Sequence, residues 1–316
     1  MRHHFAKRAL SVVMIPAAAC AFSAHAATEF DFSLSGGMVN GDRSDDIPYA
    51  YDSDTQQTIT GDLGDGLSFG AGVGVTVDDT WRIALDYQQN RMDSTAVYDS
   101  DLAATNDCNI QPVQGFVDDC FDNANYDVET KFWTVDLVAG YKMTLGSAEV
   151  TPYVGLRYLD YEQDISTDYL YPGGFENFAT NQHDYSGFGP KIGVDLFTGI
   201  GSTQFFVEGG LAVARIMTGD RKQDVYELRT IGGSFLLDNA ESEERDIDPT
   251  TIEASVKLGY DFRNGTRVGL GYRYHRISDL LDTRTTNEDP AADEFSGKAE
   301  ADIEAGSVFL ELTQTF

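Results

Sequence analysis

Residues 67–90 read LSFGAGVGVTVDDTWRIALDYQQN, and this stretch decides the fold. Apolar side chains occupy every second position on both sides of the Asp78-Asp79 pair, and glycine or polar residues fill the positions between them. Alternation with a period of two is typical of a β-strand that has one apolar face. Two such runs joined by a short turn predict an antiparallel hairpin.

The same alternation recurs along the rest of the chain and predicts ten strands. They cover roughly residues 29–38, 67–77, 81–90, 133–142, 153–158, 188–196, 204–213, 252–262, 267–275 and 307–316. Short turns at Asp78-Asp79, 144–149, 199–202 and 263–265 alternate with five long segments, 40–65, 93–130, 164–184, 217–250 and 279–304. An even number of antiparallel strands, with short and long connections in turn, is the layout of an up-and-down outer-membrane β-barrel. We expect the long segments to be extracellular loops and the short ones periplasmic turns.

A soluble β-sandwich is the competing interpretation, because its strands also alternate. Two features favour the barrel. Many positions on the polar face are glycine, and glycine in a strand marks close approach by another group. Aromatic residues on the apolar face gather near the strand ends, as in the girdles at the two membrane interfaces. The predicted girdles are Trp81, Tyr141, Phe205, Tyr260, Phe262 and Phe316 near the short turns, and Trp133, Tyr158, Tyr272 and Tyr274 toward the long segments.

The charge of the chain is strongly acidic and unevenly distributed. The 316 residues carry 52 acidic and 22 basic side chains, a formal net charge of −30. This balance argues against a nucleic-acid partner, which would require clustered lysine and arginine. The five long segments hold 38 of the acids and 7 of the bases, so nearly all of the excess lies on one side of the predicted barrel. Beyond residue 26, no apolar run approaches the length of a transmembrane helix.

The first 26 residues have the pattern of a cleaved signal peptide. Arg2, Lys7 and Arg8 precede an apolar stretch, and Ala24-His25-Ala26 supplies the small residues that signal peptidase accepts. Cleavage would leave residues 27–316 as the barrel; lipidation at Cys20 is disfavoured, because Ala17 stands where a large aliphatic residue is usual. In the exported chain, Cys108 and Cys120 form an even pair and are expected to close a surface loop by a disulfide.

Charged residues on the polar faces of the strands are expected to point into the lumen. A lone charge there would cost several kcal/mol, so these groups must pair or stay hydrated. Either they form a salt-bridged plug or they line a narrow wet passage, and we favour a mostly occluded lumen with at most a small pore. The predicted lumen network comprises Arg82, Asp86, Asp136, Lys142, Arg157, Lys191, Asp195, Glu208, Glu253, Lys257, Asp261, Arg267, Arg273 and Glu311.

The sequence predicts no catalytic residues, cofactor or dedicated metal site. Beyond residue 26 only His183 and His275 could act as imidazole bases, and no Asp-x-His motif occurs. A hydrolase at the barrel rim that uses His275 is therefore the weakest alternative. Calcium or magnesium bound by the acidic long segments would bridge them to lipopolysaccharide phosphates, but no calcium-loop spacing is present.

Three stretches of the second half of the chain carry a family resemblance. Residues 187–196 (GFGPKIGVDL), residues 206–212 (FVEGGLA) and the closing strand 308–316 resemble the Legionella-type major outer membrane protein family. The resemblance covers roughly residues 131–316 and implies a pore-forming or surface-exposed barrel with no catalytic residues. Pro190 cannot donate to a strand ladder, so it predicts a bulge or a local gap in pairing.

These observations together predict a protein of the bacterial outer membrane, either a narrow porin-like channel or a largely occluded barrel. A surface adhesin or structural barrel that acts through its loops is the alternative. The expected partners are outer-membrane lipid and lipopolysaccharide. The outer-membrane assembly machinery is a further partner, because the alternating terminal strand ends in Phe316 and resembles its recognition signal. We expect a monomer.

Overall fold

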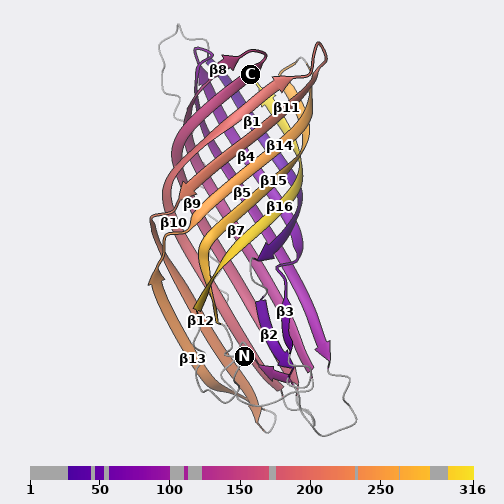
Figure 1. Ribbon diagram of the computed structural model, residues 1–316, viewed down its shortest axis with the longest axis vertical. Helices are drawn as coiled ribbons and strands as arrows, with labels where there is room; N and C mark the ends of the chain where they lie inside the picture. The colour runs from indigo at the N-terminus through magenta and orange to yellow at the C-terminus, as the bar shows by residue number, and fades with distance from the viewer. Residues whose placement is uncertain are drawn as a thin grey trace.

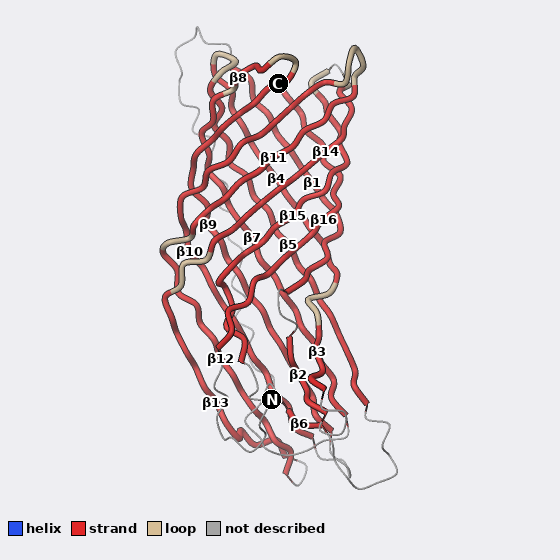
Figure 2. The backbone as a smooth tube through the Cα atoms, viewed as in Figure 1, coloured by secondary structure: helices blue, strands red, loops and turns tan. Residues whose placement is uncertain are grey.

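A computed structural model describes residues 28–43, 47–52, 57–99, 110–112, 123–170, 176–231, 234–262, 264–284 and 298–316. Almost all of these residues lie in strands (Figure 2). The described residues include no helix that is both long enough and apolar enough to cross a membrane. The predicted signal peptide and both cysteines of the predicted disulfide, Cys108 and Cys120, lie outside the described residues.

Ten antiparallel strands close into a barrel, which confirms the predicted fold class. Their order around the barrel is β10-β11-β14-β15-β16-β1-β4-β5-β7-β9, and pairing between β9 and β10 closes the ring. The strands are β1 (Thr28–Arg43), β4 (Asp65–Val77), β5 (Trp81–Asp99), β7 (Asn123–Tyr141), β9 (Ala148–Leu170), β10 (Glu176–Gly199), β11 (Phe205–Arg215), β14 (Thr250–Asp261), β15 (Thr266–Arg284) and β16 (Lys298–Thr315).

The predicted short turns all lie at one end of the barrel, the end that also holds the C-terminus (Figure 1). The hairpin of β4 and β5 turns through Asp78 and Asp79, whose φ angles are 53° and 54°. A two-residue turn of this type requires a positive φ at both central residues, and aspartate tolerates it better than most residues. The very short strand β8 (Met143–Leu145) pairs with the start of β9 at this same end.

The outer wall near the short turns is apolar around the whole circumference. Each barrel strand contributes at least one large aliphatic side chain that points outward and is exposed: Leu34, Val73, Ile83, Leu137, Val154, Ile192, Leu211, Leu258, Leu270 and Leu310. A water-soluble protein rarely exposes so large a continuous apolar surface. A band of this kind is what a barrel presents to lipid.

The apolar face changes sides where the strands leave this band. On β7, Leu137 points outward and Asp136 inward, whereas farther along the strand Val128 is buried inside and Asp127 is exposed outside. The same inversion occurs on β9, where Leu156 faces outward and Tyr161 inward. A change of the surrounding medium from lipid to water accounts for this inversion, because the outer surface becomes polar while large apolar side chains are buried inside.

The inverted part of the barrel corrects the prediction of five long loops. Strands β5, β7, β9, β10, β15 and β16 continue into those segments, and the chain adds a hairpin of β12 (Thr218–Ile231) and β13 (Ser234–Asp246) that pairs with β10. A small separate sheet joins β2 (Ile47–Asp52), β3 (Gln57–Gly61) and β6 (Ile110–Pro112). Figure 1 shows β2, β3, β12 and β13 at the end opposite the C-terminus. We call this part of the barrel the extension.

Pro190 lies at a gap in strand pairing, as predicted. On one side β10 pairs with β9 without interruption through this proline. On the other side β10 pairs with β12 up to Phe188 and with β11 only from Lys191 onward. The missing N–H of proline therefore falls where β10 changes partners and no ladder hydrogen bond is needed.

Candidate functional site

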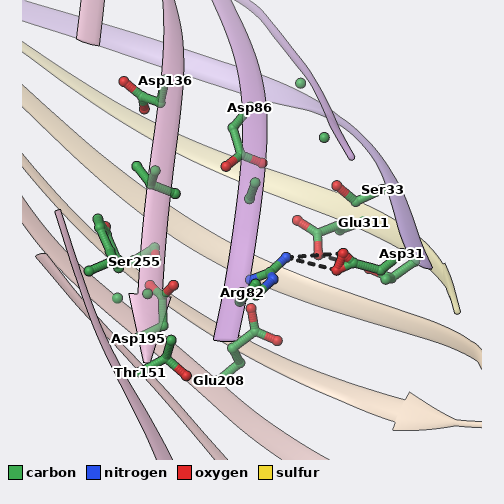
Figure 3. A pocket seen from close by; sticks show the side chains of 18 of the residues that line it. Asp31, Ser33, Arg82, Asp86, Asp136, Thr151, Asp195, Glu208, Ser255 and Glu311 are labelled. Atoms are coloured by element: carbon green, nitrogen blue, oxygen red, sulfur yellow. Dashed lines mark hydrogen bonds and ion pairs between the residues drawn. The ribbon is translucent and has the colours of Figure 1, made fainter. Parts of the chain in front are cut away.

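The half of the lumen near the short turns contains a cavity of about 340 Å³. All ten barrel strands contribute to its lining, and most of the lining side chains are charged or polar. Twelve of the fourteen predicted lumen residues line it: Arg82, Asp86, Asp136, Lys142, Lys191, Asp195, Glu208, Glu253, Lys257, Arg267, Arg273 and Glu311. Of the other two, Arg157 is buried behind this surface, and Asp261 is half-buried at the short-turn end of β14. Figure 3 shows several of these side chains around the cavity.

The inner end of the cavity is closed by four charged side chains, Asp136, Arg157, Lys191 and Glu253, which we call the ion-pair layer. Nε and Nη2 of Arg157 donate to the two carboxylate oxygens of Asp136, each at 2.7 Å. Nη2 also donates to Glu253 Oε2 at 2.5 Å. Lys191 Nζ donates to Asp136 Oδ2 at 2.7 Å and lies 3.3 Å from Glu253 Oε2. Bidentate pairing of this kind is the strongest form of an arginine–carboxylate contact.

Two further residues complete the contacts of Arg157, which is only 1% exposed. Its Nη1 donates to Thr251 Oγ1 at 3.0 Å and lies 3.3 Å from His275 Nε2. Because arginine can only donate, a hydrogen bond between these two groups requires Nε2 of His275 to be the acceptor. The ring of His275 meets that of Phe132 edge-on at 5.6 Å between centroids.

Phe132 belongs to an apolar core that lies beyond the ion-pair layer, where uncharged polar side chains such as Gln163, Thr167 and Asn177 are buried as well. This core draws side chains from strands all around the barrel. Its larger members are Val39, Leu63, Met92, Tyr126, Val128, Phe132, Leu159, Tyr161, Ile165, Tyr169, Tyr185, Ile216, Ile277, Leu280 and Ile303. The lumen is therefore hollow and charged near the short turns, but tightly packed inside the extension, where most of the large buried side chains are apolar.

Most other charges of the lumen are paired close to the cavity wall. Arg82 Nη2 donates to Asp31 at 2.8 Å. Lys142 contacts Glu149 at 3.1 Å, and Lys257 contacts both Glu208 at 3.1 Å and Glu311. The guanidinium of Arg267 lies over the rings of Phe197 and Phe206, at 5.4 and 5.9 Å from their centroids. Asp86 and Asp195 form no ion pair or hydrogen bond with any described residue.

Sequence reasoning missed several members of this network. Asp31 and Glu149 lie at polar positions of predicted strands or turns, and His275, although its alternation predicts an inward side chain that hydrogen-bonds in the lumen, is absent from the predicted network. The strand alternation could have placed all three inside the barrel, but it could not show what they contact. The inward positions of Phe206 and Phe309 could have been predicted more easily from the inward glycines. Each ring packs over a glycine on a neighbouring strand, Phe206 over Gly259 and Phe309 over Gly271.

The predicted aromatic residues lie outside the barrel in two groups. Near the short turns, Trp81 contacts Tyr141 at 5.1 Å between ring centroids, and Tyr260 contacts both Phe205 and Phe262. Phe316 is exposed at this end. Toward the extension, Trp133 contacts Tyr158 at 5.1 Å, and Tyr272 and Tyr274 point outward from β15.

The fold and the apolar band define a β-barrel protein of the bacterial outer membrane. The chain belongs to the family described as Legionella pneumophila major outer membrane protein precursor, whose model matches residues 79–297. This match begins earlier than the resemblance noted in the sequence and stops before the terminal strand. No curated protein sequence matches the chain.

Solved structures of outer-membrane barrels resemble the fold. The outer membrane protease OmpT from Escherichia coli superimposes with a TM-score of 0.53 at 10% identity, over 91% of this chain and 97% of that one. OprG from Pseudomonas aeruginosa has a TM-score of 0.30 at 10% identity, over 90% of this chain and 95% of that one. At these identities the similarity to OmpT concerns the fold alone.

Proposed function

We propose that the protein is a largely occluded outer-membrane barrel that presents a rigid acidic extension at the cell surface, rather than an open diffusion channel. The burial of Arg157 carries this proposal. Its guanidinium is held between Asp136 and Glu253 and is backed by His275 and Phe132. Charged side chains and apolar packing thus form two barriers in series along the lumen.

The outer face of the extension supports a role at the surface. Its strands project Asp93, Asp127, Glu162, Asp164 and Asp184 outward, and these acids are all exposed. Such a face favours contact with water and, through divalent cations, with lipopolysaccharide phosphates. We assign no catalytic step to the barrel. The single described hydrogen-bonding contact of the His275 ring is with Arg157, an arrangement that offers no nucleophile.

Planar-bilayer recording tests the occluded state. Folded full-length protein is added to the bilayer, and a general diffusion porin purified in the same detergent serves as the control. We expect no stepwise conductance from this protein at any applied voltage that the control tolerates, because the apolar core leaves no continuous wet path. Regular conductance steps from the wild-type protein would contradict the proposal.

A narrow channel is the second candidate, and the lumen cavity is the observation that favours it. Its lining contains nine carboxylates, against six lysine and arginine side chains. A pore with this lining would prefer cations over anions. Cation-selective steps in the same recordings would support this candidate, and they would show that the apolar core rearranges in the membrane.

A further inference from the structure

Two carboxylates of the lumen cavity make no direct polar contact with the part of the chain that the structure describes. Asp86 on β5 and Asp195 on β10 line the cavity, and neither forms an ion pair or hydrogen bond with any described residue. Arg82 acts electrostatically on both of them, but its guanidinium already donates two hydrogen bonds to Asp31. Unpaired carboxylates that repel each other within one cavity attract a cation.

Each of these carboxylates lies beside a serine hydroxyl over a glycine. A Cβ atom at Gly210 would lie 2.9 Å from Asp195 Oδ1 and 3.1 Å from Ser255 Oγ. A Cβ atom at Gly72 would likewise meet Asp86 Oδ1 and Ser33 Oγ. Each glycine therefore leaves room for a pair of acceptor oxygens that face the cavity. Figure 3 shows Asp195 close to Ser255 on one side, with Asp86 and Ser33 on the other.

The two oxygen pairs lie on opposite walls. Gly72 is on β4 and Gly210 is on β11, and these strands are five places apart in the closed ring of ten. A ligand that contacts both pairs must therefore cross the lumen.

A buried amide gives independent evidence for a ligand. Gln88 on β5 lines the same cavity and is only 8% exposed, yet no described residue hydrogen-bonds its side chain. Its amide is not enclosed by protein atoms but faces the cavity, where water or a ligand can hydrogen-bond it. Its carbonyl oxygen is a further acceptor for a donor that enters the cavity.

The acceptors suit ammonium groups better than a metal ion. Among the described residues, no three His, Cys, Asp or Glu side chains are arranged to hold a metal. A primary ammonium instead donates up to three hydrogen bonds, and carboxylate, hydroxyl and amide oxygens all accept them. A cavity of about 340 Å³ lies within the usual range for small-molecule sites.

We propose that the lumen cavity binds a linear polyamine, with one ammonium group at Asp86 and Ser33 and another at Asp195 and Ser255. Charge favours such a ligand, because carboxylates outnumber cations in the lining. Two separated acceptor pairs select a molecule that carries ammonium groups at both ends.

Isothermal titration of the folded full-length protein with spermidine, at constant ionic strength, tests this site. We expect saturable binding, and an increase in Kd of about tenfold or more for the Asp86→Asn/Asp195→Asn variant. Asp93→Asn/Asp127→Asn removes the same charge from the outer face and should leave Kd unchanged. Butylamine, which has a single ammonium group, should bind about tenfold more weakly than spermidine.

Three results would overturn the site: no saturable binding of spermidine by the wild-type protein, an equal loss of affinity in the outer-face variant, or equally tight binding of Mg²⁺. If the double variant does not fold into a heat-modifiable barrel, Gln88→Ala and Ser33→Ala replace it. Each of these should raise Kd about threefold, and unchanged affinity in both would reject the site.

Discussion

Replacing Arg157 by alanine should lower the free energy of unfolding by about 3–5 kcal/mol, because the substitution leaves buried carboxylates without their main partner. Asp136 would then keep only Lys191, and Glu253 would keep Lys191 and the longer contact with Arg273 at 3.7 Å. Urea titration of the barrel in lipid vesicles measures this change, with Trp81 and Trp133 as the intrinsic fluorescence probes.

A surface arginine provides the matched control for this experiment. Arg91 pairs with Glu129 at 3.0 Å, but both side chains are largely exposed, so Arg91→Ala should cost less than about 1 kcal/mol. In Arg157→Ala/Glu253→Gln, Asp136 and Lys191 remain as a matched ion pair, while Arg273 loses its contact with Glu253, and part of the lost stability should return. Equal effects of Arg157→Ala and Arg91→Ala would show that the ion-pair layer does not hold the barrel together.

Replacing Phe132 by alanine should cost about 3–5 kcal/mol, because it opens a cavity in the apolar core. The ring is 1% exposed and lies between that core and His275. The loss of stability should be greatest in the extension, since lipid still surrounds the strands near the short turns. Limited proteolysis should therefore cut the extension of the variant sooner than that of the wild-type protein.

Tyr226→Ala is the control for the loss of an aromatic ring. Tyr226 points outward from β12 and is exposed, so its removal should change stability by no more than about 0.5 kcal/mol. Protease resistance of Phe132→Ala equal to that of the wild-type protein would mean that the apolar core does not support the extension.

Sequence alternation predicted the strands correctly in the apolar band, because there the outward side chains are apolar and the inward ones are polar or small. In the apolar band every second residue must be apolar, so runs such as Leu67–Val77 identify their strands directly. In the extension the arrangement is inverted, with the apolar side chains inside the barrel and the polar ones outside. Acids such as Asp127 and Glu162 then occupy the outward positions, and the segments resemble polar loops. The signal was present in the alternation of Leu159, Tyr161 and Ile165, all of which point inward.

The lumen network was predictable as a set of inward charges, but its contacts were not. Asp136 and Arg157 are direct cross-strand neighbours on adjacent strands, so their pairing follows from local register. Arg157 and Glu253 are 96 residues apart, and their strands are not neighbours in the barrel. Their contact depends on the tilt and stagger of the closed sheet, which alternation does not determine.

Site-directed spin labelling in lipid vesicles tests the whole arrangement most directly, in a background where Cys20, Cys108 and Cys120 are replaced by serine. Single labels are placed at Leu137 on the outer wall, Ser35 in the lumen cavity and Ile303 in the apolar core. We expect oxygen, which partitions into lipid, to relax the label at Leu137. A water-soluble nickel chelate should relax the label at Ser35. Neither reagent should relax the label at Ile303. Relaxation at Leu137 by the nickel chelate would contradict a lipid-facing outer wall, and relaxation at Ile303 by the chelate would contradict an occluded lumen.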